Sequence, residues 1–248
     1  MREQGDSVFR KFKLNMTRSC HILDDRLNLQ KEEQMAFDYK KEFKEFYLPA
    51  KRPQLVHIPK MQFVAVSGKG NPNEEGGEYK NALSVLYAIS YTIKMSKMGD
   101  RRIEGYFDFV VPPLEGFWWQ EKNGARVSGF DYMDKSSFNW ISVIRLPDFV
   151  TQKDFEWAKE SASVKKQMDC SQAEFLELEE GDCVQIMHIG SYDDEPATIK
   201  VMDEFAETNG WQLDFSATRL HHEIYLSDPR KTSPEKLRTA IRHPVKKI

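Results

Sequence analysis

A glutamate in an otherwise apolar strand pattern is the residue of this chain best suited to acid–base chemistry. Glu223 lies between His222 and Ile224, and the alternation of side chains along a strand places Glu223 and Tyr225 on the same face. A carboxylate in an aromatic cleft is partly desolvated, so it can pair with a cationic ligand or accept a proton from water. The pattern alone favours the simpler alternative, a carboxylate on the solvated face of a half-exposed strand.

Aromatic side chains supply the other candidates for a binding site. Trp118 and Trp119 are adjacent, so in an extended segment they point to opposite faces, and one of them is expected to form a stacking wall. The alternative, in which one fills the core and the other covers it, stays open. Tyr192 follows a Gly-Ser turn and is a candidate hydrogen-bond donor to a ligand, although a half-exposed turn tyrosine fits equally. Glu115, beside the tryptophans, and Trp140, which fits the core better than a cleft, complete the ligand-binding candidates.

Signatures of metal, phosphate and nucleophile sites are missing from the sequence. His221 and His222 are neighbours in a strand and point to opposite faces, and the other histidines lack the spacing of a second ligand. The turn at residues 68–70 is shorter than a phosphate-cradling loop, and no serine or cysteine has the context of a nucleophile. We therefore predict no metal and no cofactor, and ordinary nucleophilic hydrolysis has no support.

The composition excludes several classes of partner. The chain has 248 residues and a net charge of -3, with 40% hydrophobic residues, which is enough to bury a core without a general attraction to nucleic acid or anionic membrane. Its three cysteines are an odd number without metal-like spacing and indicate reduced thiols. No segment reaches the roughly 18 apolar residues of a membrane span. We predict a cytoplasmic protein with small-molecule partners; its oligomeric state stays open.

Two internal similarities indicate that the elements around these residues form a repeat. Residues 142–148 resemble residues 239–245, and residues 63–66 resemble residues 183–186. We predict an α/β (α+β) fold of two pseudo-twofold-related β-β-α-β-β units, which form one antiparallel-rich sheet assembly with a central ligand cleft.

The remaining pattern sets the boundaries of these units. Residues 1–34 are polar and lack periodicity, which predicts a poorly ordered N-terminal extension before a domain at 35–248. The domain divides into a first unit at about 54–148, linker helices at about 151–180 and a second unit at about 181–246. We expect helices at 34–47, 79–99, 154–166, 172–179 and 197–208, strands at 55–58 (paired with 62–67), 106–111, 138–146, 183–189, 221–226 and 239–245, and an irregular insertion at 114–136.

Several motifs resemble the GyrI-like small-molecule-binding domain family. The most extensive is His222-Glu223-Ile224-Tyr225-Leu226-Ser227-Asp228-Pro229, and the further motifs occupy residues 188–192, 234–239 and 242–245. Residues 41–53 and 111–119 are similar to a stand-alone branch of that family, the cyclopropanoid cyclopropyl hydrolases. The resemblance covers roughly residues 35–248.

The resemblance implies a tandem-repeat domain whose cleft binds apolar, often aromatic or cationic, compounds. The family places a ligand-contacting glutamate at the position of Glu223, which favours a functional carboxylate there. The stand-alone branch is associated with hydrolysis of cyclopropane-bearing DNA-alkylating compounds in an aromatic cage. By this resemblance Glu223 and Tyr192 are catalytic candidates, and Trp118, Trp119 and Tyr225 line the cage. A non-catalytic sequestering protein, or a module that inhibits a macromolecular target, is the alternative.

Overall fold

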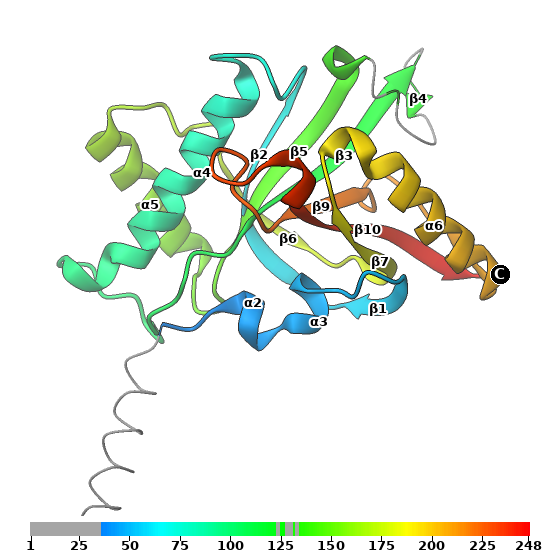
Figure 1. Cartoon of the computed structure of the whole chain (residues 1–248). Helices are drawn as coiled ribbons and strands as arrows, with labels where there is room; N and C mark the ends of the chain where they lie inside the picture. Colours follow the sequence, from blue (N-terminus) through cyan, green and yellow to red (C-terminus); the bar gives the residue numbers. More distant parts are fainter. Residues whose placement is uncertain (1–35, 123–124, 127–130, 132–133) are drawn as a thin grey trace, which may run out of the picture. The chain divides into compact units, whose positions relative to one another are not determined.

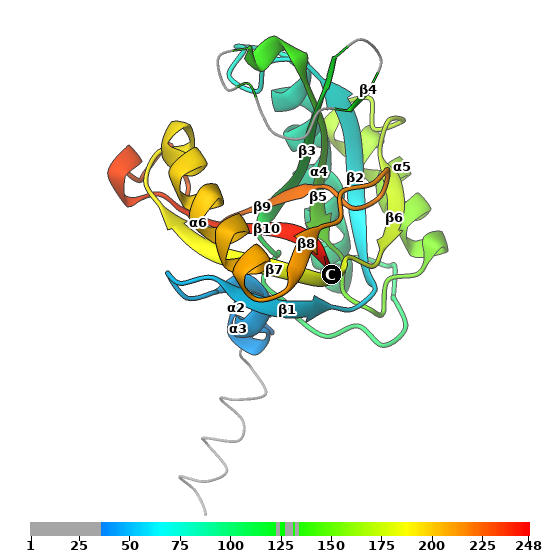
Figure 2. The same cartoon turned by 90° about the vertical axis from the view of Figure 1, so that its right-hand side faces the viewer.

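The computed structural model is organised around an antiparallel sheet whose longest path has the strand order β1-β7-β10-β9-β3-β5-β2-β6 (Figures 1 and 2). The structure describes residues 36–122, 125–126, 131 and 134–248, and the sheet belongs to the unit Asp38–Ile248. The prediction for residues 1–34 lies outside the described residues. The strands of the path are β1 (Gln54–Ile58), β2 (Met61–Lys69), β3 (Leu114–Lys122), β5 (Phe138–Arg145), β6 (Glu174–Leu178), β7 (Gly181–Ile189), β9 (His221–Tyr225) and β10 (Arg238–Lys247), while β4 (Ala125–Arg126) pairs with β3 and β8 (Trp211–Leu213) with β10.

Helices α4 (Glu78–Lys94) and α6 (Glu195–Thr208) cover the same face of this sheet. Helix α4 packs on β2 and β5, and helix α6 packs Met202 and Ala206 against β7 and β10. Helix α5 (Gln152–Lys166) begins with a capping box formed by Thr151 and Asp154 and packs on α4. Single helical turns complete the described part: α2 (Tyr39–Glu42), α3 (Lys44–Tyr47), η1 (Met95–Met98), η2 (Lys135–Ser137), η3 (Tyr192–Asp194) and η4 (Pro234–Lys236). None of the helices described here is long and apolar enough to cross a membrane.

The predicted repeat is confirmed by the strand order, which is symmetric about the junction between β3 and β9. Residues 63–66 lie in β2, which pairs with β5, and residues 183–186 lie in the equivalent strand β7, which pairs with β10. The register shifts the expected match by two residues, because Val66 faces Ser142 whereas His188 faces the equivalent Thr239. At the junction Glu115 faces Ile224 across the two antiparallel strands. The two halves therefore share one continuous sheet, with α4 over one half and α6 over the other.

The edge strands are exchanged between the halves, which corrects the expected pairing of residues 55–58 with 62–67. Strand β1 pairs with β7 of the second half, and β6 pairs with β2 of the first half. Only Pro59 and Lys60 separate β1 from β2, and the chain turns between them without forming a hairpin. Because each half is completed by a strand from the other half of the sequence, neither half has its full set of strands alone.

Three further expectations were wrong for identifiable reasons. Residues 172–179 form β6 rather than a helix, because the spacing of Phe175, Leu176 and Leu178 fits the sheet edge along β2. The expected irregular insertion contains β3, which lies at the centre of the sheet. Residues 106–111 form no strand beyond a single bridge, and Phe109 instead packs its ring against Phe149. The prolines at 112 and 113 lack the N–H donors that a strand needs.

The face of the sheet opposite α4 and α6 buries a cluster of charged side chains. His222 contacts Glu115 Oε2 through Nε2 (3.0 Å) and Glu180 Oε1 through Nδ1 (3.0 Å). Arg242 donates to Glu180 Oε2 (2.7 Å) and to the backbone oxygen of Phe46 in α3 (2.7 Å). Burial alone would raise the pKa of Glu180, but the charges of His222 and Arg242 lower it to about 2. The carboxylate therefore stays ionised inside the protein and joins β9, β10 and α3.

Removal of the Glu180 carboxylate should strongly destabilise the fold. We expect Glu180→Ala to lower the free energy of unfolding by about 3–5 kcal/mol, since it leaves the buried Arg242 charge without its partner. Urea denaturation at neutral pH measures the effect. Glu179→Ala, which removes the exposed neighbouring carboxylate, is the matched control and should change stability by less than about 0.5 kcal/mol. Equal effects of the two substitutions would contradict the role of the cluster.

The contribution of Glu180 should also depend on pH in a defined direction. Its pKa in the folded protein is lowered from 4.5 to about 2, so its stabilising effect is fully present above the unfolded value and is lost as the pH falls through this interval. The difference in unfolding free energy between the wild type and Glu180→Ala should therefore shrink from pH 5 to the most acidic pH at which the wild type still folds. A difference that stays constant over this range would contradict the assignment.

Candidate functional site

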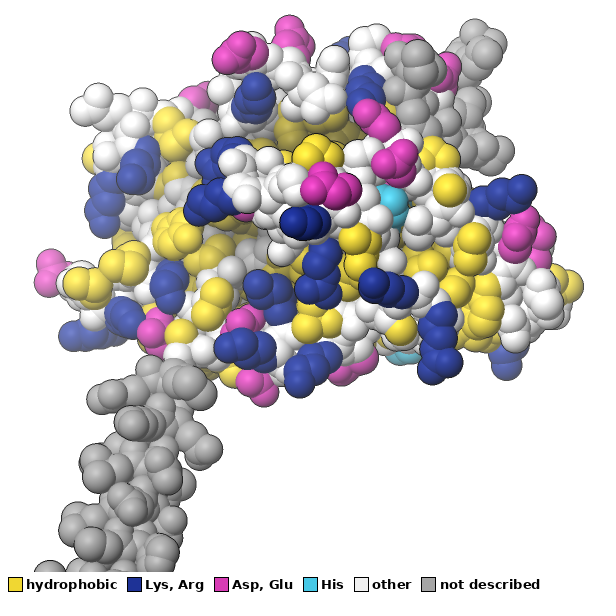
Figure 3. Space-filling model, viewed as in Figure 1, with side chains coloured by type: hydrophobic (Ala, Val, Ile, Leu, Met, Phe, Trp, Pro, Cys, Tyr) yellow, Lys and Arg dark blue, Asp and Glu magenta, His cyan; other side chains and the backbone are white. Residues whose placement is uncertain are grey.

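A cleft of about 1080 Å³ lies between α4 and α6, over the junction of β3 and β9. Figure 3 shows apolar side chains inside this hollow and charged side chains around it. Its walls combine aromatic rings with a small group of titratable side chains on β9 and at the start of α6. The residues that the argument uses are Tyr79, Trp118, Phe138, Tyr192, Glu195, His221, Glu223 and Tyr225.

Glu223 faces this cleft, and each of its oxygens is hydrogen-bonded. The Tyr225 hydroxyl donates to Oε2 (2.8 Å), and His221 Nε2 lies 2.9 Å from Oε1. All three residues belong to β9, in which alternate side chains share a face. The indole N–H of Trp118, from the neighbouring strand, donates to the Tyr225 oxygen (2.9 Å). The carboxylate is thereby fixed in position, with only 12% of its side chain exposed.

The surroundings of the cleft shift the pKa values of two neighbouring carboxyl groups, Glu223 and Glu195, in opposite directions. Burial would raise the pKa of Glu223, but the hydrogen bonds from His221 and Tyr225 outweigh it and lower the pKa. Burial, followed by the charge of Glu223, raises the pKa of Glu195 well above its usual value. Near neutral pH Glu223 is therefore the ionised member of the pair and Glu195 the protonated one. One negative charge sits among the aromatic rings.

Glu195, His221 and Glu223 also bring three potential metal-ligating atoms within 4.8 Å of one another. In the structure both oxygens of Glu223 are hydrogen-bonded, to Tyr225 and His221, and a hydrogen bond also joins Glu223 to Glu195. The three side chains therefore form one hydrogen-bonded group at the base of the cleft.

A second layer of polar groups lies behind His221. Its Nδ1 is 2.7 Å from Nε2 of His243 on β10, and Nδ1 of His243 is 2.7 Å from Oδ1 of Asp203 on α6. Both histidine rings are buried, and the ring of Phe215 packs edge-on against His243. Sequence reasoning missed this layer. The alternation that grouped Glu223 with Tyr225 would also have included His221, but the contact between His243 and Asp203 needs the packing of α6 on β10.

The structure brings together only some of the residues singled out from the sequence. Trp118 lines the cleft beside Glu223 and Tyr225, and Tyr192 lines it too, with its ring edge-on to Tyr225 at 5.8 Å. Burial raises the pKa of Tyr192 to about 12, so its phenol is a neutral donor. Trp140 is fully buried in the core and supports the cleft through an edge-on contact with Tyr79 (5.1 Å).

Two expected ligand-binding residues lie on the opposite face, which corrects their assignment. Glu115 is buried against His222 in the charge cluster described above. Trp119 donates its indole N–H to Glu121 (3.1 Å), and the guanidinium group of Arg126 lies 4.7 Å from its ring. Both belong to β3, where they alternate with Trp118 across the sheet. The adjacent tryptophans do face opposite ways, as the extended geometry required.

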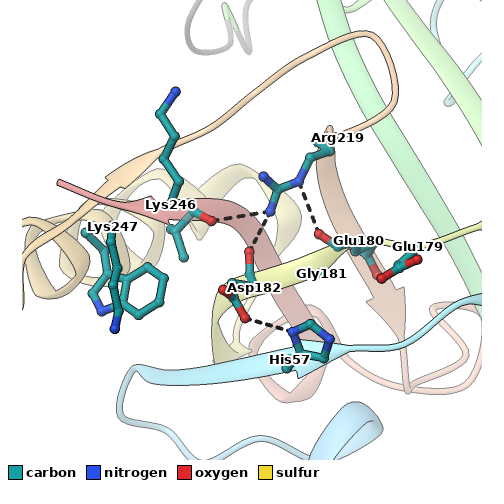
Figure 4. A pocket seen from close by; sticks show the side chains of 10 residues that line it. His57, Glu179, Glu180, Gly181, Asp182, Arg219, Lys246 and Lys247 are labelled. Carbon is teal, nitrogen blue, oxygen red and sulfur yellow. Dashed lines mark hydrogen bonds and ion pairs between the residues drawn. The ribbon is translucent and has the colours of Figure 1, made fainter.

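A smaller hollow of about 590 Å³ lies beside the N-terminal end of β7, and Arg219 links the chain segments that line it (Figure 4). This side chain donates to the backbone oxygens of Glu180 (3.1 Å), Asp182 (2.7 Å) and Val245 (3.3 Å). His57 is bound to the Asp182 carboxylate at 2.8 Å. These groups satisfy one another, and the arginine joins three chain segments, so we interpret the hollow as structural.

Comparison with known proteins places the chain among small-molecule-binding domains. A family model described as the GyrI-like small molecule binding domain matches residues 51–246. The structure of an uncharacterized conserved protein from Listeria innocua is 51% identical, with a TM-score of 0.78 over 85% of this chain and 100% of that chain. Two structures of a hydrolase from Listeria innocua are 49% and 50% identical, with TM-scores of 0.76 and 0.78 over 85% and 86% of this chain and 100% of each. No curated protein matches the chain.

The contact between Trp118 and Tyr225 depends on a glycine that faces the same cleft. A Cβ atom at Gly116 would lie 2.6 Å from Trp118 Nε1 and 3.0 Å from the Tyr225 oxygen. We expect Gly116→Ala to break their hydrogen bond, because the added methyl group pushes the two side chains apart. The indole N–H resonance of Trp118 measures this effect. Gly99→Ala, whose Cβ would meet nothing closer than 3.8 Å, is the control; an unchanged Trp118 resonance in Gly116→Ala would contradict the prediction.

Proposed function

This chain belongs to the family of GyrI-like small molecule binding domains, and from this membership we propose that its cleft binds planar apolar or cationic aromatic compounds and hydrolyses strained electrophiles among them. The observation that carries the proposal is the position of Glu223. It is an ionised carboxylate, held by its neighbours, on the inner face of an aromatic cleft.

The aromatic walls support the choice of ligand. Tyr79 and Trp118 lie against each other with ring centroids 5.5 Å apart, and Phe138 packs edge-on against Trp118 at 5.8 Å. Such rigid rings give a planar ligand a large contact area at a low entropic cost. The charge of Glu223 at the base of these walls favours ligands that carry a delocalised positive charge, since the cleft shields the pair from water.

The proposed reaction is the hydrolytic opening of a cyclopropane ring that is conjugated to a carbonyl group. Glu223 takes a proton from a water molecule, the water oxygen bonds to the strained carbon, and the ring C–C bond breaks. The electron pair of that bond moves to the carbonyl oxygen, which later gains a proton, so the net change is the addition of one water. The Tyr225 hydroxyl is engaged with Glu223, which leaves Tyr192 as the neutral donor to the developing oxyanion.

Two observations bear on turnover in different ways. The similar proteins described as hydrolases, at about half identity over most of the chain, support an enzyme. The description of the family as a binding domain supports the second candidate, a protein that sequesters such compounds unchanged. Both candidates use the same cleft, so an experiment on Glu223 separates them.

Substitution of Glu223 by glutamine tests the proposal, because it keeps the shape and removes the base. Incubation with a cyclopropane-bearing indole alkylator, followed by mass spectrometry, detects the ring-opened product that has gained one water. We expect the wild type to form this product and Glu223→Gln to lose turnover by about 10²-fold or more. Affinity for the neutral probe phenylnaphthylamine should be retained, whereas ethidium binding should weaken by about 1–3 kcal/mol.

The control is Glu207→Gln, which changes an exposed carboxylate on α6 and should behave as the wild type. A protein that binds both probes but forms no product would be a sequestering protein. Wild-type turnover and affinity in Glu223→Gln would remove this residue from the site altogether.

A further inference from the structure

The cleft extends along α4 well beyond the group around Glu223. Tyr79, Leu83, Tyr87 and Tyr91 all line it, and each lies four residues after the one before. Side chains at this spacing share one face of a helix, and the stretch from Tyr79 to Tyr91 corresponds to about 18 Å along the helix axis at a rise of about 1.5 Å per residue. The volume of about 1080 Å³ slightly exceeds the roughly 300–1,000 Å³ of pockets that enclose a drug-sized ligand. The cleft is therefore longer than one planar ring system beside Glu223 would fill.

The chain that leads into β3 forms the wall opposite these α4 residues. At one end of α4 the ring centroids of Tyr79 and Trp118 are 5.5 Å apart, and at the other end Lys94 Nζ lies 3.3 Å from Asp108 Oδ1. The chain from Asp108 to Trp118 therefore runs alongside the helix, and residues 111–114 line the cleft between these two contacts. The apolar side chains of this part of the cleft are together named the α4 arm: Leu83, Tyr87, Tyr91, residues 111–114 and Pro229.

The α4 arm presents aromatic surface that the packing of the fold leaves uncovered. Helix α4 packs on the sheet through a different face, which carries the buried Leu86 and Ile89. Tyr87 and Tyr91 remain 38% and 51% exposed, and their ring centroids lie 6.4 Å apart. Opposite them the prolines at 112 and 113 fix the backbone, since a proline ring locks its φ angle. Two rigid walls with apolar surface are suited to a flat segment of a ligand, because rigid rings give a large contact area at a low entropic cost.

The charges beside the α4 arm differ from the charge at Glu223. The ionised Glu223 favours a positive charge on the ligand at its own end of the cleft. Beside the arm, the Asp228 carboxylate already accepts from Nε and Nη2 of Arg230, at 2.9 Å each. Lys40 and Lys80 also line the cleft, and their ammonium groups disfavour a second cation. The arm is therefore suited to a neutral segment.

We propose that the α4 arm is a second subsite, which takes a neutral planar segment joined to the reacting ring of the ligand. This inference rests on the proposed function, which places the reacting ring at Glu223, and it narrows the substrate class to compounds with two planar units in line. Contacts with the second unit fix the position of the first unit along the cleft. The strained carbon is then held beside Glu223 rather than at any point along the aromatic wall.

Two neutral amides test the second subsite: 2-naphthamide, with one ring system, and N-(2-naphthyl)-2-naphthamide, with two in line. The indole N–H resonance of Trp118, followed in a titration, reports the affinity and shows that the space beside Glu223 is occupied. We expect the wild type to bind the two-ring amide about ten-fold more tightly, and Tyr87→Ala to lower that affinity about five-fold while the one-ring amide binds as before. Met95→Ala is the control, because Met95 lies one turn beyond Tyr91, is 45% exposed and lies outside the lining of the cleft; it should change neither affinity.

Equal affinities of the wild type for the two amides, or an equal loss of both in Tyr87→Ala, would overturn the second subsite. Neither amide carries a strained ring, so the measurement does not depend on turnover. A protein that prefers the two-ring amide through Tyr87 but forms no ring-opened product retains the subsite while the proposed reaction fails. A protein that forms the product without this preference retains the reaction and loses the subsite.

Discussion

The structure depends on one constraint: β9 is a short strand at the centre of the sheet, and its titratable side chains are buried on both faces. Buried charge is costly unless it is paired, so each face needs partners. On one face His222 pairs with the carboxylates of Glu115 and Glu180, and Glu180 also forms an ion pair with Arg242. On the other face the partners of Glu223 form the candidate site. Strand β9 thus carries both a member of the buried charge cluster and the carboxylate of the candidate site.

The exchange of edge strands explains how β9 is held in place. Because β1 completes the second half and β6 the first, the halves cannot separate without losing strands, and their junction stays fixed. Glu180 immediately precedes β7 and follows β6, so the segment that makes the exchange also carries the carboxylate that anchors Arg242. The exchanged edge strands and the pairing of Glu180 with Arg242 therefore stabilise the same part of the sheet.

Much of the fold and part of the site could be predicted from the sequence. The repeat was visible because residues 142–145 and 239–242, which lie in equivalent strands, keep similar side chains, and the alternation along β9 placed Glu223 beside Tyr225. The exchange of β1 and β6 was not visible, since strand pairing is a long-range choice that local pattern does not encode. Recognition of β3 as a strand would have placed Glu115 and Trp119 away from Trp118. His243 and Asp203 come together only through the packing of α6.

The two halves of the repeat have the same arrangement of strands but carry different side chains at equivalent positions of the cleft. Leu114 occupies the position of Glu223 in the first half, because Leu114 pairs with Ile144 as Glu223 pairs with the equivalent Ile241. Gly116 likewise takes the position of Tyr225, since the partners Ser142 and Thr239 are equivalent. The first half therefore contributes apolar surface and the space that Trp118 needs, while the second contributes the titratable groups. A symmetric pair would set a second carboxylate on the same face of the sheet, diagonally across the junction from Glu223, and the repulsion between the two would raise the pKa of one of them. The asymmetry leaves a single ionised base opposite an apolar wall, which is the arrangement that the proposed reaction needs.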